Sequence, residues 1–390
     1  MTKKQEKGIT LIALVVTIVV LLILAGVSIS LVLNNNGVIS KAKDAKNQYA
    51  EAQANEEKHF NEVTDWIDTK VGDTTGGGSA GGSDYDPASD GVPIPEGYYY
   101  VGGTKAKGIV ISDAEVDNEK YKGQENVGKD LAGNQWVWVP VETPSSLYTT
   151  VTAGQALSGS TGVKTTKYTN SEIISGITRG LPGDESNYRE PDILTLSSCD
   201  DKNYAKAGFS SLANMAETMV SEYEEMIASL EKYKGFYIGR YELTSNGEKT
   251  GATQTNKDWW ELYKNCTTLA VGSKVKTRMI WGLQWDATCK WLASSGFNIT
   301  DSTSWGNYKD NNGHGTKQNT GFSESWKANN IYDFAGNCDE FTQEAFYTGG
   351  RALSGGAYYD NGSNYPDSLR GFTSPTNSLY GSRPTLYLIP

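Results

Sequence analysis

The chain has 390 residues, a formal net charge of −11 at pH 7 and 21% charged residues. Proteins that bind nucleic acid or an anionic membrane surface need a face rich in lysine and arginine, so this charge argues against both kinds of partner. Only two histidines are present, His59 and His314, which leaves little material for a histidine zinc site or a Ser-His-Asp enzyme. The first ninety residues lack a globular composition, so we expect one large domain of residues 92–390, here called the head.

An uncharged apolar segment, residues 9–33, follows a short basic leader, residues 1–8. As a helix the segment would be about 38 Å long at 1.5 Å per residue, enough to cross a bilayer core of about 30 Å. The leader contains Lys3, Lys4 and Lys7, which should stay cytoplasmic. The sequence therefore predicts a single-pass membrane protein with its head extracellular, at the cell surface. A cleavable secretory signal is the alternative.

The start of this segment, Lys7 to Ile12, reads Lys-Gly-Ile-Thr-Leu-Ile. It resembles the processing site of type IV prepilins, in which a peptidase cleaves after the glycine, here between Gly8 and Ile9, and the apolar helix remains. The family's glutamate at the fifth mature position is replaced by Ala13. Two interpretations stay open: a pilin-like subunit, whose partners would include other pilin-like subunits, and a plain membrane anchor.

Residues 38–71 predict an amphipathic stalk helix, because apolar side chains recur at spacings of three and four while lysine and glutamate occupy the other faces. Residues 72–91 follow, with the run Gly-Gly-Gly-Ser-Ala-Gly-Gly-Ser at 76–83. They are too poor in apolar side chains to offset their ordering entropy, so we expect a flexible linker. Anchor, stalk and linker would hold the head away from the membrane.

A strand of the head is predicted at the triplet Tyr98–Tyr100, where aromatic residues concentrate and run into Val101. Residues 144–234 look like an insertion whose later part is helical. One face of that helix is apolar, and such a stripe is more often core than a binding groove; it comprises Leu212, Met215, Met219, Tyr223, Met226 and Leu230. A second, buried helix is predicted from a shared face of Trp281, Trp285, Cys289 and Leu292.

Several motifs in the head resemble the formylglycine-generating-enzyme-like (sulfatase-modifying factor) family. The central one sets a Gly-Asn turn and a carboxylate pair between aromatic residues. In chain order the motifs begin with Trp136–Val141 and Gly235–Thr244, which resemble the family's first and second strands. The others are Gln284–Ala287, Ile331–Thr342, Gly355-Gly356, Arg370 and Gly381-Ser382-Arg383-Pro384. The resemblance implies a C-type-lectin-like fold, so we expect an α+β head with much irregular loop structure.

The oxidases of that family use a pair of cysteines after the double glycine to activate oxygen with copper. Here the corresponding segment, residues 365–374, contains no cysteine, so formylglycine synthesis is not expected and binding is favoured over catalysis. An oxidoreductase of this type with altered chemistry is the alternative. The four cysteines are Cys199, Cys266, Cys289 and Cys338. Three disulfide connectivities and free thiols remain open for them, with free thiols favoured for Cys289 and Cys338.

Members of the family often hold structural calcium near the Gly-Asn-aromatic-Glu run. Asn337 and Glu340 occupy two matching positions, and amide and carboxylate oxygens are the ligands that calcium needs. The resemblance therefore makes calcium a candidate cofactor. The alternative is that these side chains only cap a turn.

The last forty residues, 351–390, here called the tail, are rich in tyrosine, asparagine, serine and glycine. This mixture is typical of antibody binding loops, since tyrosine gives rigid contact area and small polar residues adapt to the ligand. The tail also resembles the C-terminal variable region of proteins diversified by retroelements. We expect it to form a ligand-binding face with the contact residues Tyr358, Tyr359, Asn361, Asn364, Tyr365 and Tyr380. Ordinary surface loops are the alternative.

The sequence thus predicts a membrane-tethered, pilin-like cell-surface protein. Its head would bind an external protein or glycan ligand through the tail. The altered oxidoreductase and a minor structural pilin are the competing hypotheses.

Overall fold

The computed structural model describes residues 85–115, 120–156, 164–170, 188–190, 203–311, 315–346 and 350–390, together with Val19. The chain divides into two compact units, 1–80 and 81–390, and the head belongs to the second. Apart from Val19, the predicted leader, membrane helix and stalk lie outside the described residues, as does most of the linker. Within the described part, no helix has both the length and the apolarity needed to cross a membrane.

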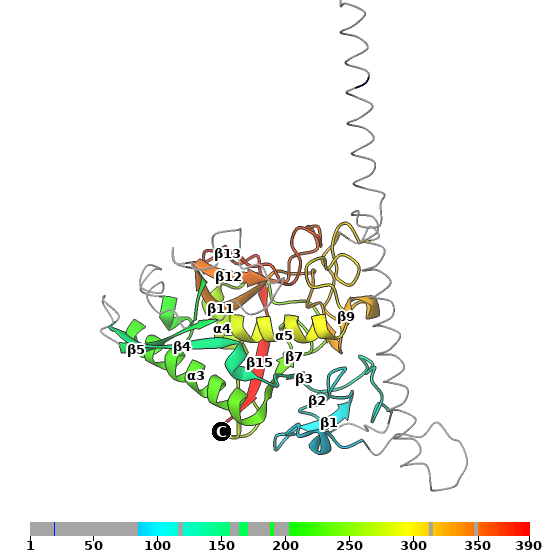
Figure 1. Ribbon diagram of the computed structural model, residues 1–390, viewed down its shortest axis with the longest axis horizontal. Coiled ribbons are helices and arrows are strands. Elements are labelled where there is room, and N and C mark those ends of the chain that lie inside the picture. Colours follow the sequence, from blue (N-terminus) through cyan, green and yellow to red (C-terminus); the bar gives the residue numbers. More distant parts are fainter. Residues whose placement is uncertain are drawn as a thin grey trace, which may run out of the picture. The chain divides into compact units, whose positions relative to one another are not determined.

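The head is built on a six-stranded antiparallel sheet, which Figure 1 shows running from β1 to β15. Its strand order is β1-β2-β3-β7-β15-β8, so strands far apart in sequence lie side by side. The predicted strands at residues 98–100, 136–141 and 235 onwards are confirmed. The six strands span Tyr99–Gly102, Val110–Ser112, Gln135–Pro140, Gly235–Gly239, Val275–Met279 and Pro384–Leu388 as β1, β2, β3, β7, β8 and β15.

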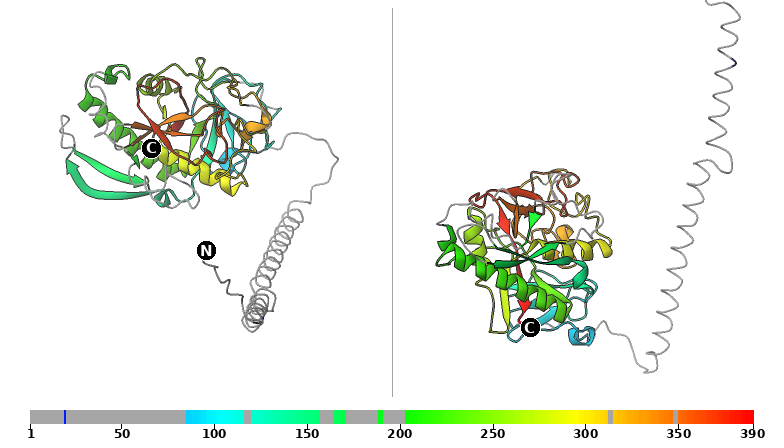
Figure 2. Two further views of the ribbon diagram at one scale, coloured as in Figure 1. Left: turned by 90° about the horizontal axis from the view of Figure 1, so that it is seen from above. Right: turned by 60° about the vertical axis from the view of Figure 1, so that its left-hand side comes forward.

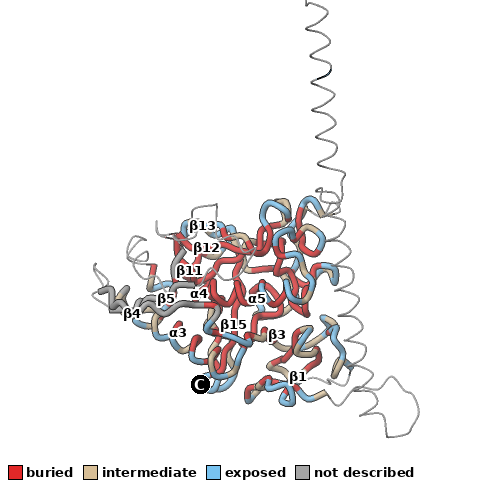
Figure 3. Tube along the Cα trace, viewed as in Figure 1, coloured by how far each residue is buried: buried red, intermediate tan, exposed pale blue. Residues whose placement is uncertain are grey.

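Side chains on a strand alternate between the two faces of its sheet. Both faces of this sheet are buried. Trp136 and Trp138 of β3 pack on one face, where the Trp138 ring meets Tyr237 edge-on at 4.9 Å. Val137 and Val139 point to the other face, into the larger apolar core that the helices cover. Figure 3 shows this buried interior surrounded by exposed loops.

Three α-helices, α3 (Leu212–Tyr233), α4 (Trp259–Cys266) and α5 (Gly282–Ser294), pack on the strands. Five residues of the apolar stripe of α3 are buried, and the helix contacts β7 and β15, which confirms that these residues are core: Met215, Met219, Tyr223, Met226 and Leu230. The predicted buried helix is α5, which contacts β3 and β11. Its first turn is closed by Glu190, whose carboxylate accepts hydrogen bonds from the N–H groups of Gly282 and Leu283.

A second sheet carries the tail and lies at the opposite end of the head from β1 and β2 (Figure 1). Its order is β13-β12-β11-β14, with β6 paired to β11. Most pairs are antiparallel, whereas β14 runs parallel to β11. The strands β6, β11, β12, β13 and β14 span Tyr188–Arg189, Glu340–Phe346, Gly350–Ser354, Gly371–Thr373 and Gly381–Ser382.

The remaining elements are short or peripheral. Two small hairpins pair β4 with β5 and β9 with β10; the first extends from the body of the head in Figure 2. They span Tyr148–Ala156, Lys164–Asn170, Lys327–Ala328 and Ile331–Tyr332. The 3-10 helices η1, η2, η5 and η6 span Pro87–Asp90, Pro144–Ser146, Asn203–Ala205 and Glu324–Trp326.

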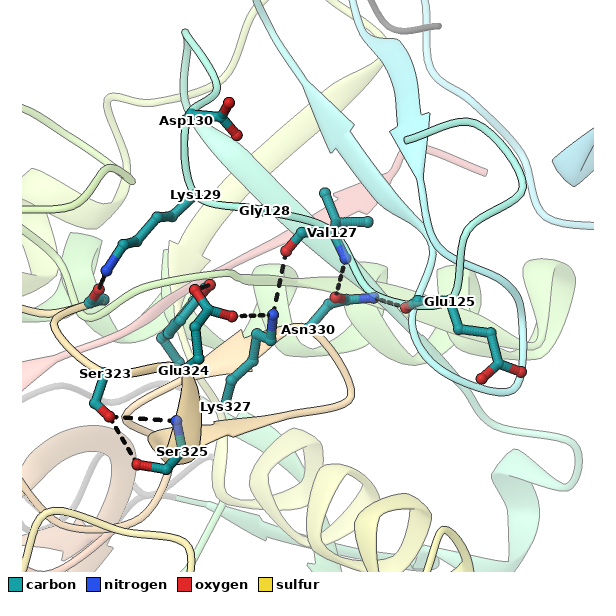
Figure 4. A network of polar contacts seen from close by, with 12 residues as sticks. Glu125, Val127, Gly128, Lys129, Asp130, Ser323, Glu324, Ser325, Lys327 and Asn330 are labelled. Carbon is teal, nitrogen blue, oxygen red and sulfur yellow. Dashed lines mark hydrogen bonds and ion pairs between the residues drawn. The ribbon is translucent and has the colours of Figure 1, made fainter. Parts of the chain in front are cut away.

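Irregular segments are held by side-chain bonds to backbone groups, as Figure 4 shows for the 125–130 loop. The Asn330 amide accepts a hydrogen bond from the N–H of Val127 and donates to the Glu125 carbonyl, at 3.0 and 2.8 Å. The Lys129 ammonium donates to the carbonyl of Gly321 at 3.0 Å. These bonds satisfy loop backbone that no strand pairs.

The described residues therefore form a mixed head of helices and sheets with extensive loops, as expected for an α+β protein. Its lectin-like topology stays a prediction. Residues 85–90, placed in the linker by the sequence, contact the head: the hydroxyl of Tyr85 accepts a hydrogen bond from the N–H of Lys105 at 3.1 Å. Cys266, Cys289 and Cys338 are buried free thiols, which confirms the prediction for the last two; Cys199 lies outside the described residues.

Candidate ligand-binding site

The six predicted contact residues lie on two loops of the tail, between β12 and β13 and between β13 and β14. Tyr359 and Tyr365 are 47% and 50% exposed, unusual values for large aromatic side chains. Asn364 is also exposed, whereas Tyr358, Asn361 and Tyr380 are half-buried. All six therefore reach the surface at least in part, as a binding face requires.

Three of the six, Tyr359, Tyr365 and Tyr380, converge on one cavity, here called the aromatic pocket. Tyr358, Asn361 and Asn364 are not among its lining residues. The pocket has a volume of about 230 Å³ and is lined by Asp339, Leu353, Gly356, Tyr359, Asp360, Tyr365, Pro366, Leu369, Gly371, Phe372 and Tyr380.

The double glycine forms a tight turn at the start of the loop between β12 and β13. Gly355 and Gly356 both have positive φ angles, 97° and 67°, which glycine adopts most readily. A Cβ on Gly356 would lie 2.4 Å from the carbonyl oxygen of Tyr365, a clash with backbone. The two glycines thus bring the Tyr365 segment back over the pocket.

Stacked rings fix the aromatic walls. Phe372 of β13 stacks on Phe346 of β11, with centroids 3.7 Å apart and planes at 8°, and it remains 48% exposed on its other side. Tyr380 meets Phe341 edge-on at 5.7 Å. Tyr359 meets Tyr358 edge-on at 5.0 Å, which explains how Tyr358 contributes without lining the cavity. The rings are therefore held in place before any ligand arrives.

Two carboxylates, Asp339 and Asp360, complete the lining. Burial, the nearby negative charge of Asp360 and that of Glu340 raise the pKa of Asp339 to about 7, although a hydrogen bond from Tyr359 Oη to Asp339 Oδ2 at 3.3 Å opposes the rise. Burial also raises the pKa of Asp360. No ion pair among the described residues joins either aspartate to a lysine or arginine, and no basic residue lines the pocket. The pocket is therefore acidic and aromatic.

Behind the pocket, a buried ion pair holds the start of β11. Both carboxylate oxygens of Glu340 accept hydrogen bonds from the Arg383 guanidinium, at 2.7 to 3.2 Å. The same guanidinium donates to the carbonyls of Gly239 and Tyr332 at 3.0 Å. Arg383 thereby ties the second sheet to the first.

More carboxylates surround this arginine than it can neutralise. We call Glu242, Glu248, Asp333, Glu340 and Arg383 the Arg383 cluster. All five are buried, and burial raises the pKa of Asp333 to about 6 and that of Glu340 to about 7. The pKa values of Glu242 and Glu248 are raised further, again mainly by burial.

The predicted calcium residues lie within this arrangement. Asn337 Oδ1 accepts bonds from Asn307 and from the N–H of Gln318, at 3.0 and 2.9 Å, and its Nδ2 donates to Glu242 at 2.7 Å. Glu340 is engaged by Arg383, so an ion would have to compete with that guanidinium. The described residues contain no group of three histidine, cysteine or acidic side chains placed to hold a metal ion. Calcium at this position stays a prediction.

A second buried arginine, Arg370, lies directly before β13. It pairs with Glu344, and with Asp286 of α5 at 2.7 Å. Arg351 and Arg383 are buried as well, so all three arginines of the tail belong to its buried interior.

The segment 365–374 shows no catalytic arrangement. Asp367 is buried, and its carboxylate accepts hydrogen bonds from Ser302 at 2.6 Å and from the Cys289 thiol at 3.4 Å. Burial raises the pKa of Cys289 well above its ordinary value, so the reactive thiolate form is disfavoured. The pocket lining itself includes no serine, cysteine, histidine or lysine. Its chemistry suits recognition.

A larger cavity, of about 930 Å³, lies between the 104–107 loop, the end of β3 and the last turns of α5. Its lining includes Lys105, Lys107 and Trp291 but no residue of the tail. By volume alone, this cavity would be the better candidate for a ligand-binding site. The aromatic pocket is the better candidate because it gathers several large, exposed rings, which soluble proteins seldom concentrate without a partner.

Sequence reasoning missed Asp339, Phe372 and the neighbouring Leu379, which is 71% exposed. Asp339 belongs to the carboxylate pair of the central motif, and Phe372 lies two residues after Arg370. Only Leu379 carried a signal in the sequence: it is an apolar residue directly after the polar run from Thr376 to Ser378.

Comparison with known proteins gave little. No protein-family model and no curated protein matches the chain. Among solved structures, the chain is similar to Treponema denticola variable protein 1, with 14% sequence identity and a TM-score of 0.25. The similarity covers 66% of this chain and 96% of that protein. At this TM-score the match does not establish a common fold.

Proposed function

We propose that this protein is a membrane-tethered, cell-surface binding protein whose head captures an external ligand through the aromatic pocket. The observation that carries the proposal is the convergence of three exposed or half-buried tyrosines and Phe372 on one cavity. Preorganised aromatic side chains bury large area at little entropic cost, as in antibody binding sites.

The surface location rests on the apolar segment 9–33 and the basic leader before it. Cleavage between Gly8 and Ile9, and partnership with other pilin-like subunits, belong to the same proposal and rest on the same residues. The ligand class is an extracellular protein or a glycan.

A binding experiment tests the role of the pocket. The full chain in detergent is applied to a glycan array and to a displayed random-peptide library. Ligands selected on the natural protein should lose at least about tenfold in affinity for Tyr359→Ala/Tyr365→Ala, because two anchor rings are removed. Tyr99→Ala, which removes an exposed tyrosine from the distant strand β1, should bind as the natural protein does. Equal affinity of the double variant would refute the proposal.

Diversification of the tail is the second part of the proposal. If codons are randomised, sequencing of the 3′ end of the gene across related isolates should show variation at exposed positions such as Tyr359, Asn364 and Tyr365. The buried Ser354 and Asp367 should stay fixed, because they serve packing and hydrogen bonding. An invariant tail would leave a binding protein with one fixed ligand.

A further inference from the structure

The size of the aromatic pocket limits what can enter it. Sites for small organic ligands usually have volumes of about 300 to 1,000 Å³. At about 230 Å³ this pocket is smaller, and its lining includes the exposed rings of Tyr359, Tyr365 and Phe372. These dimensions fit one side chain of a macromolecule that also rests on the surrounding surface.

The charge of the lining selects the kind of side chain. Asp339 and Asp360 repel each other, and no basic residue lines the pocket. The cation whose charge acts on Asp360 is Lys309, an exposed residue outside the lining. An incoming positive group would relieve this repulsion. A neutral sugar would bring no compensating charge.

The aromatic walls favour the same kind of group. A lysine or arginine cation placed against the face of a tyrosine or phenylalanine ring is stabilised by the ring quadrupole, the more so where water is excluded. This head already uses the interaction, since the Arg351 guanidinium lies 3.9 Å from the Trp259 ring centroid. In the pocket, the rings of Tyr359, Phe372 and Tyr380 are available for it.

We propose that the aromatic pocket binds the cationic side chain of a lysine or arginine that projects from an extracellular protein, with Asp339 and Asp360 as its counter-charges. This rests on the proposed binding function and narrows it to a protein ligand with a basic anchor residue.

The first test uses n-butylammonium, which mimics a lysine side chain, and n-butanol as its neutral counterpart. Saturation-transfer NMR with the full chain should show millimolar binding of the ammonium and none of the alcohol. Asp339→Asn/Asp360→Asn should weaken the ammonium at least about tenfold, since asparagine keeps the shape and removes the charge. Glu96→Gln/Glu142→Gln removes the same charge from exposed sites outside the lining and should leave binding unchanged.

The second test separates this inference from the proposed function. Peptides selected on the natural protein should contain lysine or arginine at a position that substitution to alanine shows to be essential. The inference is wrong, while the binding function stands, if two results are found together. The selected peptides depend on Tyr359 or Tyr365 of the protein but contain no essential basic residue, and butylammonium binds the Asp339→Asn/Asp360→Asn variant as tightly as the natural protein. If nothing selected depends on Tyr359 or Tyr365, the binding function fails as well.

Discussion

Asp339 and Glu340 are neighbours in sequence, yet they serve two different regions of the head. Side chains of successive residues in extended chain point to opposite sides. Glu340 accordingly faces Arg383 in the buried cluster, while Asp339 faces the aromatic pocket. In the cluster an arginine offsets the carboxylates; in the pocket no basic residue does. Glu340, which holds the two sheets together, thus has a cation within the chain, whereas Asp339 at the surface site does not.

The largest effect is expected from removing the cation of the cluster. Arg383→Met should lower the free energy of unfolding by about 3 to 5 kcal/mol, because Glu340 would remain buried without its partner. Urea unfolding of the full chain followed by far-ultraviolet circular dichroism measures this.

Two variants sharpen that experiment. Arg383→Met/Glu340→Gln should recover part of the loss, because no uncompensated charge then remains at that pair. Lys105→Met breaks a surface ion pair with Glu142, in which the two side chains are 37% and 74% exposed. This variant should lower the free energy of unfolding by less than about 1 kcal/mol. A loss for Arg383→Met as small as that for Lys105→Met would show that the cluster does not anchor the fold.

A smaller effect is expected from pH. Asp333, Asp339, Glu340 and Asp367 have pKa values raised to about 6 or 7 by burial, against about 4 in an unfolded chain. Each binds its proton more tightly when folded, so its stabilisation is complete below about pH 4 and is lost as pH rises through 6 to 7. The head should therefore be about 1 to 3 kcal/mol less stable at pH 8 than at pH 5.5. Urea midpoints at the two pH values measure the difference.

The pocket and the cluster can be separated within this pH effect. Asp339→Asn removes one of the titrating groups and should raise stability at pH 8 by on the order of 1 kcal/mol, a modest gain because the side chain is partly in contact with water. At pH 5.5 the gain should be smaller, because the folded state there still holds Asp339 protonated and only the unfolded state is ionised. Greater stability at pH 8 than at pH 5.5 in the natural protein would show that the raised pKa values are wrong.

The strands of the main sheet could be predicted because Trp136 to Val139 alternate on a strand buried on both faces. The helices α3 and α5 could be predicted from apolar stripes at helical spacing. Gly355, Gly356 and the tail arginines were recognisable because turns and buried ion pairs leave few alternatives in residue type. These features depend on local periodicity or on a motif.

The pocket could be predicted only in part. Its tyrosines stood out by composition, but Asp339 and Phe372 join them through strand pairing between distant segments, which no local pattern encodes. The acidic partners of Arg383 were missed for the same reason, since Glu242 comes from one motif, Asp333 and Glu340 from a second, and Arg383 itself from a third. The sequence did not show that these distant residues lie together in the folded head.

The position of β15 ties the binding loops to the completion of the whole domain. This last strand, Pro384–Leu388, lies between β7 and β8 in the main sheet, and the loops that line the pocket come just before it in the chain. A ribosome that meets a premature stop codon within the loops releases a chain without an inner strand and without Arg383. Such a chain cannot close its core. A folded head therefore requires a reading frame that stays open through the loops and through β15.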